Sequence, residues 1–84
     1  MTKYIHHDRE YIRIEIHATL NGYTVFAVNL QTNNMVPLTQ GIATLLEAVL
    51  PEDYHPHHSS LKAARKDMQR LADVNGWAEL TETV

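Results

Sequence analysis

The sequence predicts an α+β domain in which a three-stranded antiparallel β-meander is followed by two α-helices that form a second layer. Polar and apolar residues alternate over residues 10–20, which is the period of a strand with one buried face. An Asn-Gly dipeptide follows directly, as in two-residue β-hairpins. After residue 39 the apolar residues cluster at the spacings of an amphipathic helix. The expected division of a single domain over residues 1–84 is an antiparallel sheet at 10–38, a helix at 39–50, a loop at 51–58, a helix at 59–76 and a tail at 77–84.

The first two strands are predicted to form a hairpin around Asn21-Gly22, because these residues tolerate the positive φ angles of a type I′ turn. Such a turn pairs Leu20 with Tyr23 and sets the register along both strands. Pro37 has no N–H to donate to a neighbouring strand. It therefore places the short third strand at an edge of the sheet.

Both predicted helices carry start or stop signals. Thr39 is a suitable N-cap for the first helix, and Pro51 is expected to end it. One of the two serines at positions 59 and 60 is expected to cap the second helix. Gly76 supplies its left-handed exit, after which Trp77 is expected to fold back onto the last turn in a Schellman motif. The polar tail that follows is expected to fray.

The predicted register divides the apolar residues of the sheet between two faces. The expected core face carries Ile12, Ile14, Ile16, Leu20, Val25, Val36 and Leu38. The other face carries Arg13, Glu15 and His17 beside four apolar residues, which are Phe26, Val28, Leu30 and Met35. Because small monomers rarely leave such a stripe in solvent, we expect a partner protein or a second copy of the chain to cover it. The alternatives are that one helix covers each face, or that a β-bulge changes the register.

The composition argues against several classes of protein. Seven Lys and Arg against ten Asp and Glu give a net charge of -3, unlike a strongly basic nucleic-acid binder. Cysteine is absent, which excludes disulfides and thiolate metal sites. No apolar run reaches the roughly 18 to 20 residues of a membrane span, and no signal peptide is recognisable, so we expect a cytoplasmic protein. Since no catalytic or phosphate-binding motif occurs, we expect no enzyme activity, no catalytic residues and no cofactor.

Six histidines form two conspicuous groups, at positions 6–7 and 55–58, with one more at 17. Imidazole ligates transition metals and titrates near neutral pH, so a His-based metal or pH sensor is one alternative function. A fixed metal site needs more ligands and an orienting outer shell, and we therefore expect none here. His17 is expected to contact Phe26 rather than a metal ion.

The second predicted helix concentrates four of the seven basic residues on one stripe, which consists of Lys62, Arg65, Lys66 and Arg70. We call these four residues the basic stripe. It is either a solvated helix face or a contact surface for phosphates or an acidic protein. A nucleic-acid-binding homodimer that combines two stripes is therefore a second alternative function. It is less favoured because the chain lacks a helix-turn-helix pair.

In length, absence of cysteine and strand-first order, the chain resembles the small accessory proteins of bacteriophages and mobile elements. The stretches NGYTVFAVNL and SSLKAARKDMQRLADVNGW are also similar to phage-borne sequences. This group includes anti-CRISPR and other anti-defence inhibitors, and the resemblance implies direct binding to a host complex. We therefore expect a non-catalytic protein-interaction module, a homodimer whose protein partner belongs to a host defence or nucleoprotein complex. Its expected partner-binding residues are Arg13, Phe26, Val28, Leu30, Met35 and the basic stripe.

Overall fold

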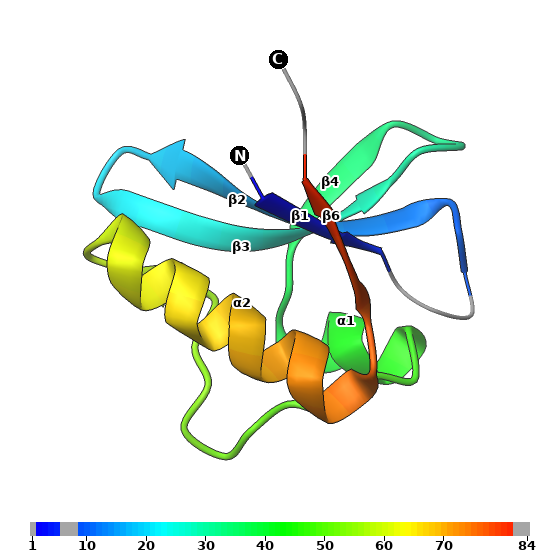
Figure 1. Ribbon diagram of the computed structural model, residues 1–84. Coiled ribbons are helices and arrows are strands. Elements are labelled where there is room, and N and C mark those ends of the chain that lie inside the picture. The colour runs from blue at the N-terminus through cyan, green and yellow to red at the C-terminus, as the bar shows by residue number, and fades with distance from the viewer. Residues whose placement is uncertain (1, 6–8, 82–84) are drawn as a thin grey trace.

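A computed structural model describes residues 2–5 and 9–81 of the chain (Figure 1). The strands in these ranges are β1 (Thr2–Ile5), β2 (Ile12–Thr19), β3 (Gly22–Asn29), β4 (Asn34–Pro37), β5 (His57–His58) and β6 (Ala78–Thr81), and the helices are α1 (Gln40–Leu45) and α2 (Leu61–Asn75). The strand order is β4-β3-β2-β1-β6, and β5 pairs with the part of β3 that β4 leaves free. The predicted α+β class is confirmed, since the meander β2-β3-β4 precedes two helices that lie on one side of the sheet.

The hairpin of β2 and β3 has a register that differs by two residues from the predicted one. Thr19 pairs with Gly22, so the turn residues are Leu20 and Asn21. The type I′ turn was a wrong prediction, because neither turn residue has the positive φ that it requires. Strand side chains alternate with a period of two, and a shift by two residues therefore leaves each of them on its predicted face.

The core lies between the sheet and the helices. The side chains that are at most 1% exposed include Ile14, Val25, Leu38, Met68 and Leu71. Two residues expected in the core are not buried. Leu20 is 98% exposed because the observed register places it in the turn, and Val36 is exposed on the edge strand β4.

Helix α1 ends five residues earlier than predicted. Thr39 caps its start as expected, with its hydroxyl accepting a hydrogen bond from the Ile42 N–H. After the helix, Glu47 has a left-handed φ of 58°. The Asn75 side chain then accepts a hydrogen bond from the Val49 N–H and donates one to its carbonyl. These two bonds stabilise an irregular backbone where the apolar spacing predicted a further helical turn.

Helix α2 has the predicted caps. The Ser60 hydroxyl accepts a hydrogen bond from the Ala63 N–H, and Gly76 at the C-terminal end has a φ of 69°. The Trp77 N–H donates to the carbonyl of Ala72, which is the Schellman bond. Trp77 is buried, so the chain turns back against the core after the helix.

Three short strands lie outside the predicted meander. Strand β6 pairs with β1 in the segment that was expected to be a frayed tail, and β5 lies in the predicted loop. Strand β1 is also tied to the helical layer, because the Tyr4 hydroxyl donates to Gln69 Oε1 of α2. Burial raises the pKa of the Tyr4 hydroxyl most, and the nearby carboxylates of Glu79 and Asp73 raise it further. The two ends of the chain thus form the second edge of the sheet.

Candidate functional site

One face of the sheet is covered by neither α1 nor α2 (Figure 1). We call it the open sheet face, and its side chains from β2, β3 and β4 are Arg13, Glu15, His17, Thr24, Phe26, Val28, Met35 and Pro37. The alternative of one helix on each face is wrong, since both helices lie on the opposite side. The alternative of a bulge is also wrong, because the pairing of β2 with β3 continues without interruption from Ile12 to Thr19.

The structure brings together all the sheet residues that were expected to bind a partner. Phe26 and Val28 are half-buried, whereas Met35 is 48% exposed and Leu30, just after β3, is 42% exposed. Arg13 lies beside Val28 across the β2–β3 pair. Its Nε atom is buried and has no hydrogen-bond partner among the described residues. The face therefore combines exposed apolar groups with one incompletely satisfied guanidinium.

Polar side chains form a row across the open sheet face that sequence reasoning missed. His17 lies opposite Thr24, and Thr24 lies opposite His57 of β5. Thr24 is only 1% exposed, and its Oγ1 atom is 2.8 Å from His57 Nδ1. His17 Nε2 is 2.9 Å from a carboxylate oxygen of the buried Glu15. The alternation of polar and apolar residues predicts that Glu15 and His17 lie on the same face of the strand. No feature of the sequence predicts that His57 lies beside them.

A pocket of about 510 Å³ opens next to this row, where the edge of β3 passes from β4 to β5. We call it the hairpin pocket, and it is lined by Thr19, Leu20, Asn21, Tyr23, Thr24, Phe26, Pro37, His57, His58 and Ser59. The Phe26 ring contacts the His17 ring edge-on, with centroids 5.7 Å apart, which confirms the expected contact. The backbone of Val25 is not free for a ligand, because its N–H donates to Pro56 and its carbonyl accepts from Leu38. Ligands therefore meet side chains here rather than an open strand edge.

A second pocket, of about 310 Å³, lies at the other end of β3 and is mainly apolar. Val36 and Leu45 line it, and both side chains are exposed to solvent. Leu30 and Met35 belong to the same end of the β3–β4 pair. Exposed apolar side chains thus occur on both faces around strand β4.

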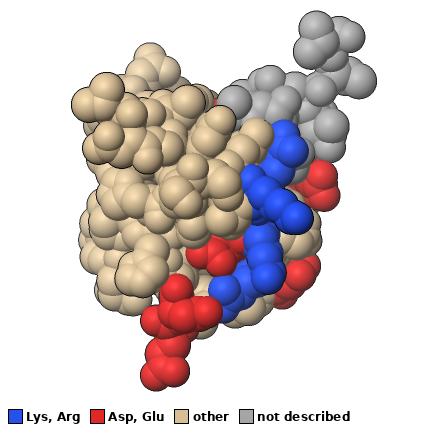
Figure 2. All heavy atoms as spheres, turned by 90° about the vertical axis from the view of Figure 1, so that its left-hand side faces the viewer, with Lys and Arg blue, Asp and Glu red and all other residues tan. Residues whose placement is uncertain are grey.

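The basic stripe does not adjoin the open sheet face, because α2 packs against the opposite side of the sheet. Figure 2 shows a narrow band of Lys and Arg atoms with Asp and Glu atoms beside it, next to a large uncharged area. Lys62, Arg65 and Lys66 are exposed and make no ion pair within the part of the chain that the structure describes. Arg70 differs, since it is held between two carboxylates.

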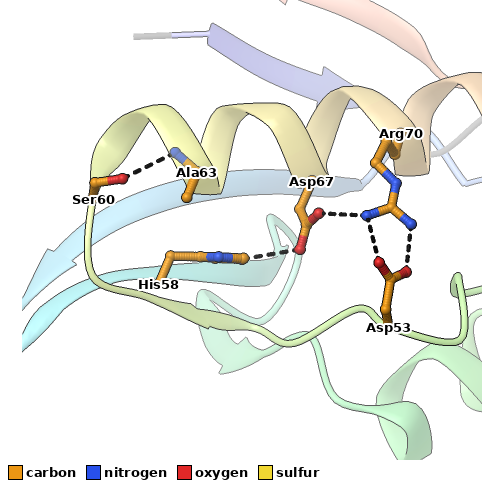
Figure 3. A network of polar contacts seen from close by, with 6 residues as sticks. All are labelled: Asp53, His58, Ser60, Ala63, Asp67 and Arg70. Carbon is orange, nitrogen blue, oxygen red and sulfur yellow. Dashed lines mark hydrogen bonds and ion pairs between the residues drawn. The ribbon is translucent and has the colours of Figure 1, made fainter.

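Arg70 binds Asp53 through both terminal nitrogens and Asp67 through Nη1 at 2.9 Å (Figure 3). The hydrogen bond from Arg70 lowers the pKa of Asp53, and the same bond raises the pKa of Arg70. On the other side of the network, Asp67 lies 3.3 Å from His58 Nε2 without hydrogen-bond geometry. These contacts connect the 51–58 segment to α2. Arg70, one of the four residues of the basic stripe, therefore has a structural role.

We expect Asp53→Asn to destabilise the fold slightly at pH 7 and to lose this effect as the pH falls through the lowered pKa of Asp53. A carboxylate whose pKa is lowered in the folded state adds stability above its ordinary value of 3.8, and this contribution is lost as the pH falls through the folded pKa. Urea unfolding of both proteins at several pH values measures the difference. If the variant is less stable than the wild type by the same free energy of unfolding even in strong acid, the charge of the Asp53 carboxylate does not contribute.

The histidines of the 55–58 segment do not converge. His55 and His57 are exposed, while His58 points toward Asp67. Among residues 2–5 and 9–81 there is no group of three or more His, Cys, Asp or Glu side chains that could hold a metal ion. The group at positions 6–7 lies outside the described residues.

No helix in the described ranges has both the length and the apolar character needed to cross a membrane. Comparison with known protein families, with curated proteins and with solved structures finds no match to this chain. The open sheet face, the hairpin pocket beside it and the second pocket near α1 are therefore the features that bear on function.

Proposed function

We propose that the protein is a non-catalytic interaction module that binds a protein partner through the open sheet face, centred on Met35 and Leu30. The observation that carries this proposal is the exposure of these two large apolar side chains on a face without a helix. Burying them against a partner removes apolar surface from water, at about 25 cal/mol per Å². Half-buried Phe26 and Val28 extend the same surface.

Recognition at this surface uses side chains rather than the addition of a strand. Strand β4 has four residues and ends at Pro37, which has no N–H. Short edge strands that contain proline are poor templates for pairing with another chain. Arg13 lies beside Val28 at the border of the apolar surface, where a guanidinium suits a carboxylate or carbonyl of the partner.

The proposal extends to the class of partner and to the place of action. The resemblance to phage accessory proteins supports an inhibitor that acts in the cytoplasm on a host defence complex. A second copy of the chain is the other partner to test, because the surface is apolar and small chains gain stability from dimerisation. Nucleic acid is not favoured, since Arg70 is already paired and the net charge is -3.

Met35→Asp is expected to weaken partner binding by about 30-fold or more, because it buries a charge in the interface. Val74→Asp is the matched control, since Val74 is an apolar residue of similar exposure on α2. Light scattering of the purified proteins tests for a dimer. Affinity purification from host cells, followed by binding measurements with the purified partner, tests for another protein.

The proposal requires that Met35→Asp, but not Val74→Asp, loses the dimer or the purified partner while keeping a wild-type melting temperature. A protein that is monomeric and binds the same partner equally well in all three forms would contradict it. So would loss of binding only in Val74→Asp.

A further inference from the structure

We propose that the hairpin pocket is a binding site for a neutral planar heterocycle of the nucleobase class. This inference goes beyond the proposed protein-binding function, because the pocket lies toward the other end of β3 from Leu30 and Met35 and shares only Phe26 with the four apolar side chains of the protein-binding surface. Its volume of about 510 Å³ falls in the usual range for small-molecule sites, roughly 300 to 1,000 Å³.

The two aromatic side chains of the pocket, Phe26 and His57, each contact a polar or aromatic neighbour on the sheet. On one side, buried Glu15 bonds His17, and the His17 ring contacts the Phe26 ring in an edge-on arrangement. On the other side, buried Thr24 bonds Nδ1 of His57 and so orients that ring with Nε2 left available. Burial of a carboxylate and a hydroxyl on a sheet face is unfavourable unless each is bonded, and here each bond positions an aromatic wall.

The lining contains no Asp, Glu, Lys or Arg. A charged ligand therefore meets no permanently charged side chain in the lining, which favours an uncharged ligand over phosphates and carboxylates. The charge of the whole chain, -3, further disfavours anions. The preferred ligand is consequently uncharged.

The lining contains both aromatic rings and hydrogen-bonding groups. Phe26 and His57 offer aromatic surfaces, on which planar rings stack, whereas the lining residue Tyr23 packs against the core. Nε2 of His57, the Asn21 amide and the Ser59 hydroxyl offer donors and acceptors. An aromatic ring with several polar groups on its edge satisfies both sets, whereas an aliphatic ligand leaves the polar groups unpaired.

The test is a titration of the ¹⁵N-labelled full chain with adenosine, guanosine, cytidine and uridine, followed by two-dimensional NMR. We expect at least one nucleoside to shift the amides of Asn21, Thr24 and Ser59 in a saturable manner. Its 5′-monophosphate should bind no more tightly. A short single-stranded oligonucleotide of the same base distinguishes a base within a strand from a free nucleoside.

His57→Ala is expected to weaken binding about tenfold by removing one hydrogen bond and one ring. His55→Ala is the matched control, because His55 lies two residues away and does not line the pocket. Phe26→Leu keeps an apolar wall without the stacking surface and should weaken binding at least fivefold. The spectrum of each variant reports whether it remains folded.

Absence of saturable shifts with all four nucleosides would overturn the assignment. It would also be overturned by equal losses in His57→Ala and His55→Ala, or by monophosphates binding more tightly than nucleosides. None of these results depends on Met35, so the nucleoside site and the protein-binding surface are tested separately.

Discussion

Gly22→Ala is expected to destabilise the fold by about 2 to 4 kcal/mol, because the position has neither the backbone angles nor the space for a side chain. Gly22 has a φ of 145°, which residues with a Cβ rarely adopt. A Cβ atom there would overlap the backbone carbonyl oxygen of His58. Relief of this overlap moves β5 away from β3 and separates His57 from Thr24.

Gly41→Ala is the control for this variant. Gly41 lies in α1, and a Cβ atom at this position would meet no atom within 4 Å apart from its chain neighbours and the backbone of its own helix. Alanine favours helix over glycine by roughly 0.5 to 1 kcal/mol, so this variant should be neutral or slightly more stable. Urea unfolding compares the two with the wild type. Equal stabilities for the two alanine variants would contradict the close approach of His58.

Leu71→Ala is expected to cost about 2 to 5 kcal/mol, because it leaves a cavity between α2 and the sheet. Leu71 is fully buried, and the helix contributes Met68 and Ala72 to the same core. Such a loss is a large part of the stability of a domain of this size, which is on the order of 4 to 13 kcal/mol. We expect a variant that is mostly folded only at low temperature.

Val74→Ala provides the comparison on the same helix. Val74 is exposed, so its truncation removes little buried surface, and the change should stay within about 0.5 kcal/mol. Thermal melting followed by circular dichroism measures both variants. If Leu71→Ala and Val74→Ala lose similar amounts of stability, α2 packs against the sheet with a different face.

The candidate site could be predicted from the sequence only in part. The expectation that Phe26, Val28, Leu30 and Met35 lie on one surface follows from local alternation, and the structure places them there. The hairpin pocket could not be predicted in this way. It depends on His57 reaching β3 across a separation of 33 residues, and no local pattern encodes that approach.

The sequence by itself determined the order of the meander and helices, the faces of the long strands and the caps of α2. These features depend on the period of two, the helical spacing and single capping residues, which act over a few neighbouring positions. The predicted faces of the strand side chains are correct although the predicted β2–β3 register is wrong by two residues, because side chains alternate between the faces with a period of two.

Only the tertiary structure decided where α1 ends, that the two ends of the chain pair as β1 and β6, and that β5 completes the edge of β3. Asn75 stabilises the irregular backbone at Val49 from 26 residues away, where local spacing favours helix. Short strands and early helix ends gain their free energy from such distant partners rather than from their own residues. Their positions therefore emerge only when the whole chain has folded.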